Sequence, residues 1–387
     1  MKLLILATSK TSKAVIRIRY EAIKLGHTVL VVNPMDLFLL ISNSESGYDR
    51  IYYAVGGKVC RLNIKDFDAA VVRLGDQTGY GAFIVEHINK NLRVFCTNSA
   101  EGIRNATNQL KTLQVLSSNG IPTPRTVFAQ NPTHIEHLIN KVGGYPIVVK
   151  LLHGSGGQGV SLLRDKKTAV PVLQSLFKSR SSVIIQEYLD SGRVDYRVIV
   201  LGGTVVASYK RTAAKGNFKA NLKQGGNGTP VQLDEADKLL CINAARALNL
   251  GSAGIDLIKH DGRTYVIEAN ANFGWGVEKI TRLNIAVMMV QYCEQNYQNK
   301  NVEKTQVLSF QKQLMNERMQ NEALSQHIGV LNGHMKFFTE DSYVKKIYRS
   351  AKGKVVSYTD RNRNKKKIKV QFIKDIYTIM LDSFQIK

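Results

Sequence analysis

Asp256, Glu268 and Asn270 are the residues whose types and spacing point most directly to chemistry. Asp256 lies in the apolar run GIDLI, and Glu268 and Asn270 end the run TYVIEAN, with an Asp-Gly turn signal at residues 261–262 between them. Residues two apart on a strand share a face, and a hairpin pairs side chains across its strands, so these three side chains are expected to meet. Two carboxylates and one amide suit a Mg²⁺ ion that also contacts substrate phosphates. An ordinary hairpin with exposed acids fits the same spacing.

Lys150 closes the apolar run IVVK shortly before the glycine-rich stretch GSGGQG at residues 154–159. Most lysines are merely solvated, but a lysine that ends an interior strand needs an anionic partner, for example a nucleotide phosphate. The stretch fits the pattern GxGxxG, which in dinucleotide-binding folds requires a helix directly after it. Because VSLLRD follows and is expected to be a strand, we interpret the loop as a hairpin tip that covers phosphates, or as a plain turn.

The elements that position these residues form an α/β pattern. Near the N-terminus a helix is expected between two strands, and this alternation predicts a parallel sheet. Prolines then mark a unit boundary near residue 98. The expected strands are residues 2–8, 28–34, 67–75, 145–150, 160–165, 182–189 and 195–211, with the hairpin at 254–270; the expected helices are residues 12–27, 102–120 and 234–250.

Composition excludes several classes of protein. The chain has 387 residues, more than the ~150 usual for one domain, and 44% of them are hydrophobic. Four scattered cysteines without a CxxC pair argue against a disulfide framework and a zinc site, and favour a reducing, cytoplasmic compartment. No run of 18 or more apolar residues occurs, so a membrane partner is not expected. The net charge of +24 predicts an anionic partner such as phosphates, nucleic acid or an acidic peptide.

Four motifs in order carry a resemblance to a known family: VVKLLHGSGGQGV, IIQEYLDSGRVDYR, GNFKANLKQGG and AGIDLIKHDGRTYVIEANANFGWGVEKITRLNIA. Over about residues 1–298 the chain resembles the ATP-grasp superfamily, and within it the RimK type, ligases that add glutamate to the C-terminus of a small-subunit ribosomal protein. The resemblance implies an ATP-grasp fold behind an N-terminal Rossmann-like, pre-ATP-grasp domain. The expected domains are residues 1–97, 98–298 and a basic extension at 299–387.

The resemblance also implies roles for individual residues. The positions that match the family's nucleotide contacts are Lys150, Glu187, Tyr188, Asp195, Lys219, Ala220 and Asn221. Asp256, Glu268 and Asn270 match the ligands of Mg²⁺ or Mn²⁺, with two ions expected. Arg197 and Arg211 are expected to be catalytic, because phosphoryl transfer needs positioned cations more than it needs proton transfer.

Three positions depart from the family pattern. Lys219 stands where the family has arginine, which keeps the charge and loses the bidentate fork. Asn-Gln at residues 108–109 replaces Asp-Lys, so Lys111 would have to substitute for a nucleotide lysine. Asn-Phe at residues 272–273 replaces Ser-Pro beside the acceptor site.

The activity implied is ATP-dependent carboxylate–amine ligation through an acyl phosphate. The expected partners are ATP, an amino acid, with glutamate favoured, and a carboxylate acceptor at the C-terminus of a peptide or protein; the chain is also compatible with an oligomer. Two alternatives stay open: a ligase of the same fold that makes a small metabolite or modifies a cofactor, and a non-catalytic nucleic-acid or ribosome-binding protein. The retained Asp256, Glu268 and Asn270 count against the second alternative.

Residues 341–387 lie outside the resemblance and hold thirteen lysines and arginines against four aspartates. The stretch RNRNKKKIK at residues 361–369 is the most basic part. A block of like charge is usually a solvated extension. Apolar residues interleave with the basic ones, however, so a small folded appendage that binds an acidic protein or RNA is the alternative.

Overall fold

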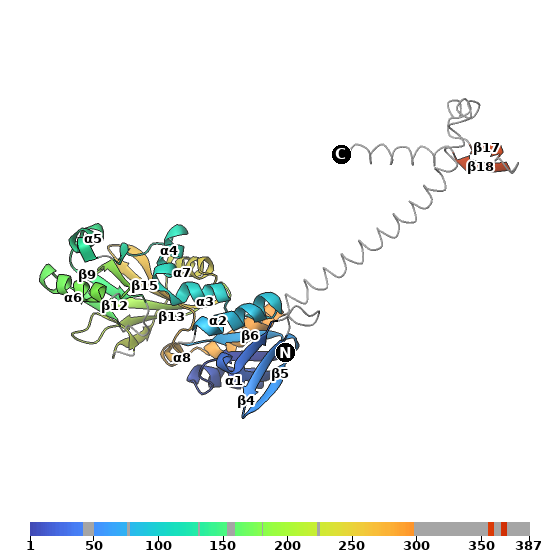
Figure 1. Ribbon diagram of the computed structural model, residues 1–387, viewed down its shortest axis with the longest axis horizontal. Helices are drawn as coiled ribbons and strands as arrows, with labels where there is room; N and C mark the ends of the chain where they lie inside the picture. Colours follow the sequence, from blue (N-terminus) through green and yellow to red (C-terminus); the bar gives the residue numbers. More distant parts are fainter. Residues whose placement is uncertain are drawn as a thin grey trace. The chain divides into compact units, whose positions relative to one another are not determined.

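The structure is a computed structural model, and it describes residues 1–41, 50–75, 78–130, 132–152, 159–179, 181–222 and 225–297, together with the backbone of two short strands. Figure 1 shows the chain coloured along its sequence. It divides into two compact units, Met1–Asn301 and Val302–Lys387. Residues 154–158 of the glycine-rich stretch lie outside the described residues. So does the basic segment at residues 341–387, apart from strands β17 (Val355–Thr359) and β18 (Lys365–Lys369), which pair antiparallel.

The first unit begins with the parallel sheet that the sequence predicts. Its strands lie in the order β2-β1-β6-β7, and every neighbouring pair is parallel. The strands are β1 (Lys2–Ala7), β2 (Thr28–Val32), β6 (Ala69–Arg73) and β7 (Phe95–Cys96), and the helices beside them are α1 (Lys13–Lys24), α2 (Thr78–Glu86) and α3 (Ala100–Thr107). Helix α1 starts at Ser12, whose hydroxyl accepts a hydrogen bond from the Val15 amide. It ends before Gly26, which has a φ of +80°.

A second, antiparallel sheet in this region was not predicted from the sequence. It has the order β3-β4-β5, formed by β3 (Leu37–Leu40), β4 (Arg50–Val55) and β5 (Lys58–Leu62). Most of β5 is exposed, so its residues show no clear alternation between apolar and polar side chains. The periodicity on which strand prediction depends is therefore missing here.

Two further antiparallel sheets hold the candidate site residues. One has the order β10-β9-β11-β8 and the other the order β14-β13-β12-β15-β16. The strands are β8 (Thr126–Ala129), β9 (Ile147–Leu151), β10 (Val160–Leu163), β11 (Val183–Glu187), β12 (Val194–Leu201), β13 (Thr204–Thr212), β14 (Asn227–Pro230), β15 (Ser252–His260) and β16 (Arg263–Asn270). Strands β9 and β10 pair antiparallel on either side of the glycine-rich stretch, so the prediction that a strand follows the loop is confirmed. The turn between β15 and β16 uses positive φ values at Asp261 and Gly262, as an Asp-Gly hairpin requires.

Further helices are α4 (Gln109–Ser118), α5 (Ile135–Lys141), α6 (Lys166–Lys178), α7 (Glu235–Ala247) and α8 (Gly276–Thr281), and residues 285–297 are helical as well. The single helix expected over residues 102–120 is two helices, α3 and α4. They are separated at Asn108, whose backbone is extended and whose side chain caps α4. The side chain therefore offers the backbone an alternative to a continuous helix.

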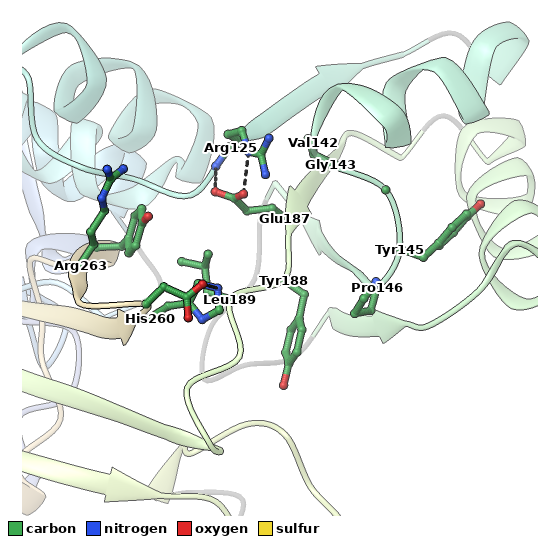
Figure 2. Close-up of a pocket in the computed structure, with 13 residues that line it drawn as sticks. Arg125, Val142, Gly143, Tyr145, Pro146, Glu187, Tyr188, Leu189, His260 and Arg263 are labelled. Atoms are coloured by element: carbon green, nitrogen blue, oxygen red, sulfur yellow. Dashed lines mark hydrogen bonds and ion pairs between the residues drawn. The ribbon is translucent and has the colours of Figure 1, made fainter.

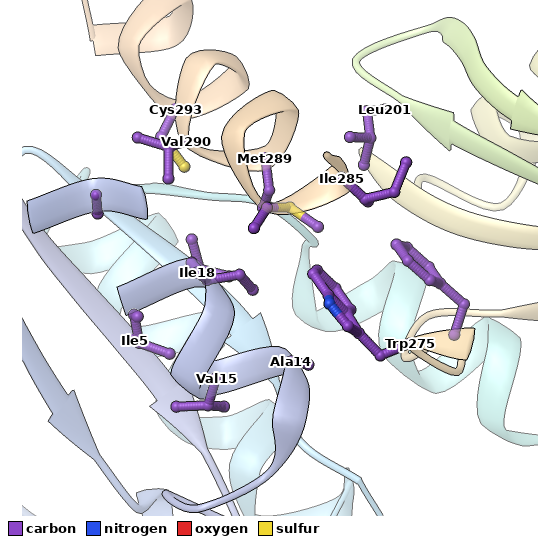
Figure 3. Packing of buried hydrophobic residues seen from close by; sticks show 14 of the residues in the cluster. Ile5, Ala14, Val15, Ile18, Leu201, Trp275, Ile285, Met289, Val290 and Cys293 are labelled. Carbon is purple, nitrogen blue, oxygen red and sulfur yellow. The ribbon is translucent and has the colours of Figure 1, made fainter. Parts of the chain in front are cut away.

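One hydrophobic core joins the parallel sheet to the later part of the same unit. Figure 3 shows Ile5 of β1 and Ile18 of α1 in the same cluster as Leu201, Trp275 and Met289. The shared core places the C-terminal ends of β1 and β6 beside the segment that follows β16. Among the described helices, none is both long and apolar enough to cross a bilayer.

Candidate functional site

The β15–β16 hairpin brings the three predicted metal ligands to one region. Asp256 and Glu268 are directly paired across the two strands, and Asn270 pairs with Gly254 two positions further along. A register shift beside Asp256 leaves Ile267 as an extra residue in β16. Because residues two apart share a face, Glu268 and Asn270 lie on the same side of the strand as Asp256. The local bulge keeps this alignment in spite of the odd residue.

Asp256 is buried and held by two arginines from neighbouring strands. Arg197 forms a bidentate ion pair with it, and Arg211 Nη2 donates a hydrogen bond of 2.8 Å to its Oδ2. Arg211 also pairs with both carboxylate oxygens of Asp195, at 2.5 and 2.8 Å. We call these four residues, from β12, β13 and β15, the Asp–Arg network. The network has two positive and two negative charges, so its own charge is balanced.

Burial and charge act in opposite directions on the two carboxyl groups of this network. For Asp256, burial raises the pKa, but the two arginines outweigh it and hold the pKa below its ordinary value. For Asp195, burial dominates and raises the pKa in spite of Arg211. Of the two carboxyl groups, Asp256 is therefore the more firmly ionised.

Lys150 lies in the other sheet and interacts electrostatically with two carboxylates of the β15–β16 hairpin, Glu268 and Asp256. It lies in β9, with 8% of its surface exposed, between Val160 of β10 and Ile184 of β11. Burial lowers the pKa of Lys150, and the negative charges of Glu268 and Asp256 oppose that shift. The anionic partners that the sequence required for this lysine are thus carboxylates of the facing hairpin.

A pocket between the two sheets gathers all seven residues that the sequence predicts to contact the nucleotide. Its walls include Lys150, Glu187, Tyr188, Asp195, Lys219, Ala220 and Asn221, and also Glu268. Apolar side chains such as Val148, Leu189 and Ile258 line the same space. A flat base can lie against apolar walls while cations at one end face phosphates, so the mixture suits a nucleotide. Arg197, Arg211, Asp256 and Asn270 do not line this pocket.

The donor set of the hairpin fits a hard cation. No described residue donates a hydrogen bond to Glu268, so its carboxylate is available. Asn270 uses its amide nitrogen toward the Gly254 carbonyl at 3.5 Å, which leaves its oxygen available. Asp256 Oδ2 already accepts hydrogen bonds from both arginines, whereas Oδ1 accepts one from Arg197 and retains a second lone pair. Within the described parts of the chain, no three His, Cys, Asp or Glu side chains form a metal cage, and an open site that completes its coordination with phosphates is what Mg²⁺ prefers.

Arg125 is a site residue that sequence reasoning missed. Its backbone amide and its Nε donate hydrogen bonds of 2.6 and 2.7 Å to the two carboxylate oxygens of Glu187. This pair fixes the end of β11, where Glu187 and Tyr188 line the pocket between the sheets. The two residues are 62 positions apart, and only strand pairing brings them together.

A second pocket, of about 490 Å³, is also lined by Glu187 at the end of β11, and Figure 2 shows its lining residues. Residues 187–189 line both pockets, but the walls of this one come otherwise from Arg125, from residues 142–146 and from the turn at 260–265. It contains none of the predicted metal ligands, whereas Glu268 lines the pocket between the sheets. The chemistry is therefore assigned to the pocket between the sheets.

Comparisons with known proteins agree with this geometry. Residues 106–293 match the model of the RimK-like ATP-grasp domain, and residues 1–103 match that of the RimK pre-ATP-grasp domain. A protein of Legionella pneumophila (strain Corby) called "Probable alpha-L-glutamate ligase" is 34% identical over 297 residues, covering 76% of this chain and 95% of the relative.

Solved structures share the fold. The ATP-grasp ligase PsnB in complex with its minimal precursor, Mg and ADP has a TM-score of 0.58 at 18% identity, covering 77% of this chain and 98% of that one. D-alanine–D-alanine ligase from Bacillus anthracis in complex with ATP has a TM-score of 0.54 at 18% identity, covering 78% and 99%. The expected ATP-grasp fold with an N-terminal pre-ATP-grasp domain is confirmed, and the chain belongs to the RimK-like ATP-grasp family of carboxylate–amine ligases.

Proposed function

We propose that this protein uses ATP and Mg²⁺ to join a carboxylate to the amine of an amino acid through an acyl phosphate. The observation that carries the proposal is that Lys150 and Glu268, from facing sheets, line one pocket together with the other six predicted nucleotide contacts. A buried lysine and two carboxylates from facing sheets make a charge arrangement that phosphates and a divalent cation would complete.

The proposed reaction has two steps. In the first step an oxygen of the substrate carboxylate attacks the γ-phosphorus of ATP, the bond to the bridging oxygen breaks, and ADP leaves. In the second step the amine nitrogen attacks the acyl carbon, the bond to the phosphate oxygen breaks, and the amine gives up a proton as the amide forms. Both steps build negative charge on phosphate oxygens, so fixed cations are the main requirement.

The site residues are proposed to have different roles according to their positions. Lys150 and Lys219 line the pocket and are proposed to bind phosphate oxygens. Bound Mg²⁺ would neutralise phosphate charge, and Glu268, Asn270 and Asp256 would hold it. Arg197 and Arg211 remain proposed catalytic residues, but their guanidinium groups are engaged with Asp195 and Asp256 in the structure. They would serve the phosphoryl group only if these carboxylates exchange hydrogen-bond partners. A second ion and Mn²⁺ in place of Mg²⁺ remain part of the proposal.

Glutamate is the proposed amino acid, and a peptide or protein C-terminus is the proposed acceptor. The name of the Legionella relative supports the first choice, and the peptide bound to PsnB supports the second. The basic segment at residues 341–387 is proposed to contact an acidic acceptor or RNA. We keep residues 1–97, 98–298 and 299–387 as the proposed domains.

A small-molecule ligase is the second candidate. The observation that favours it is the shared fold with D-alanine–D-alanine ligase, whose name describes the joining of two single amino acids. The two candidates differ only in the acceptor. The same substrate panel therefore distinguishes them.

Release of inorganic phosphate from ATP tests the proposal when it is measured across a panel of amino acids and carboxylate acceptors. We expect release to require both substrates and Mg²⁺, and to be lost in Glu268→Gln. An acceptor labelled with ¹⁸O in its carboxylate then tests the mechanism, because an acyl phosphate transfers one labelled oxygen to the released phosphate. Phosphate without the label would mean that water, not the carboxylate, attacks ATP.

A further inference from the structure

Arg73 is a buried cation that the proposed reaction does not use. It ends strand β6, is 8% exposed, and donates a hydrogen bond of 2.8 Å from Nη2 to the backbone carbonyl of Phe273. Its guanidinium carbon lies 5.1 Å from the ring centre of Phe273 and 5.2 Å from that of Trp275. The two rings are themselves stacked, at 6.0 Å. Arg73 therefore contacts the chain just beyond the predicted metal ligands in three ways.

No carboxylate compensates this charge. Among the described residues Arg73 forms no ion pair, its Nη1 has no hydrogen-bond partner, and the nearby Trp275 Nε1 has none. Burial lowers the pKa of Arg73 to about 10. A neutral side chain would fill the same space without this cost, since a buried charge without a counter-ion is unfavourable. The arginine is thus poorly explained by packing alone.

A second residue holds the same segment from the other end. Asn98, at the start of α3, donates from Nδ2 to the Ala271 carbonyl at 3.0 Å and to the Ser252 carbonyl at 2.9 Å. Its Oδ1 accepts a hydrogen bond from the Ser252 amide at 2.8 Å. Asn98 therefore holds the Ala271 carbonyl and Arg73 holds the Phe273 carbonyl. Both residues come before the two antiparallel site sheets in the sequence.

Strand β15 also limits the position of this segment, through Gly254. A side-chain carbon at Gly254 would lie 2.7 Å from Phe273 Cβ and 3.3 Å from Arg197 Cδ. Gly254 pairs with Asn270, so Phe273 folds back onto the site strand beside the arginine that holds Asp256. Phe273 is three positions after Asn270, a reach of at most about 10 Å. A displacement of the segment would therefore reach Asn270 and Arg197 directly.

We propose that Arg73 is a positioning residue: it holds residues 271–275 in place and thereby fixes the end of β16, which carries Glu268 and Asn270. The inference rests on the proposed function for its kinetic consequence. It assigns the N-terminal domain a direct role in aligning the site, through one guanidinium group. That guanidinium group packs against the stacked Phe273 and Trp275 rings.

The kinetic test compares Arg73→Met and Arg73→Lys with the control Arg17→Met. Arg17 of α1 also bridges the N-terminal region to the later part of the unit, through Glu278 and Asn284, but it does not touch residues 271–275. We expect Arg73→Met to lower kcat by about 10- to 100-fold, because small misplacements at a reacting centre have effects of this size. KM for ATP should change by less than about twofold, since Arg73 does not line the nucleotide pocket. The kcat of Arg73→Lys should lie between those of the wild type and Arg73→Met. Arg17→Met should have the kcat and KM of the wild type.

Trp275 is the only tryptophan of the chain and supplies a readout that does not depend on activity. It is 7% exposed, so its emission should be poorly quenched by acrylamide in the wild type. In Arg73→Met the emission should shift to longer wavelength and quenching should increase, while Arg17→Met should leave both unchanged. Midpoints of thermal unfolding of all variants show whether a loss of kcat merely follows a loss of stability.

Wild-type kcat in Arg73→Met would overturn the proposal. Equal losses of kcat in Arg73→Met and Arg17→Met, or unchanged Trp275 emission in Arg73→Met, would overturn it as well. If Arg73→Met does not fold, the comparison of Arg73→Lys with Arg17→Met decides by the same criteria. If the wild type releases no phosphate with any substrate, the proposed function fails, whereas the emission of Trp275 still decides whether Arg73 holds the segment.

Discussion

Two groups of arginines with little solvent exposure have different surroundings in this protein. In the Asp–Arg network, Arg197 and Arg211 face Asp195 and Asp256, and the charges match. At the end of β6, Arg73 faces two aromatic rings and a backbone carbonyl, and none of the residues that the structure describes gives it a carboxylate partner. The first arrangement holds a carboxylate firmly ionised beside a nucleotide pocket, which suits a cation site. The second holds backbone, which suits a support for that site. The comparison teaches that the arginines proposed to be catalytic, Arg197 and Arg211, are paired with carboxylates, whereas the arginine proposed to position the site, Arg73, is not.

The largest effect is expected from the two carboxylates of the hairpin. Asp256→Asn and Glu268→Gln should both reduce turnover to background, because Mg²⁺ would lose a charged ligand. Their stabilities should differ. Asp256→Asn removes the partner of two buried arginines and should cost about 3–5 kcal/mol of unfolding free energy, whereas Glu268 has no hydrogen-bond partner among the described residues. Denaturant unfolding beside the phosphate-release assay measures both, and full turnover in both variants would remove the metal assignment.

Lys150→Met should raise KM for ATP by about 10- to 100-fold, because a charge-assisted hydrogen bond to a phosphate contributes about 1.5–3 kcal/mol. Stability should not fall, since the substitution removes a desolvated charge. The matched control is Lys178→Met, at the exposed end of α6. Initial rates over a range of ATP concentrations measure the effect. An unchanged KM in Lys150→Met would show that the lysine only balances Glu268 and Asp256.

Two glycines test how closely the supporting segment must fit. Gly254→Ala would place a carbon 2.7 Å from Phe273 Cβ, so we expect a loss of about 1–3 kcal/mol from overpacking, together with reduced kcat. Gly274 lies in the same segment, and a side-chain carbon there would meet nothing within 4 Å. Gly274→Ala should therefore match the wild type in thermal unfolding and in rate. Equal behaviour of the two variants would show that the segment tolerates displacement.

The smallest effect on ATP handling is expected from removal of residues 341–387. Every predicted nucleotide and metal residue precedes this segment, so KM for ATP and for a free amino acid should stay near wild type. Affinity for an acidic protein acceptor or RNA should fall, and the affinity of the full chain should decline steeply with salt because it rests on counterion release. Binding of both forms at low and moderate salt measures this. Identical affinities and salt slopes would mean that the segment does not recruit the acceptor.

The sequence was informative where one local pattern carried the signal. The apolar runs around the Asp-Gly turn predicted the hairpin, and the run IVVK predicted that Lys150 would be buried near negative charge. The same signal, a charged residue at the end of an apolar strand, is present in AAVVR, and Arg73 could have been found from it. What faces that arginine could not, because the aromatic rings lie 200 residues later and come near it only through the shared core.

Other features had no local signal at all. The pairing of Arg125 with Glu187 depends on the register of β8 against β11. The engagement of Arg197 and Arg211 by carboxylates depends on the order of β13, β12 and β15 in their sheet. The sheet of β3, β4 and β5 was missed; most of β5 is exposed, and its residues show no clear alternation between apolar and polar side chains. Tertiary register, not residue type, decides such contacts.

The central claim is that the pocket between the two antiparallel sheets binds ATP together with a cation held by the β15–β16 hairpin. Calorimetric titration of a non-hydrolysable ATP analogue, with and without Mg²⁺, tests it most directly in the wild type and in Glu268→Gln. We predict that Mg²⁺ tightens binding by at least about tenfold in the wild type, or about 1.4 kcal/mol, and that this gain is absent in Glu268→Gln while metal-free binding is unchanged. An equal gain from Mg²⁺ in both proteins would contradict the account.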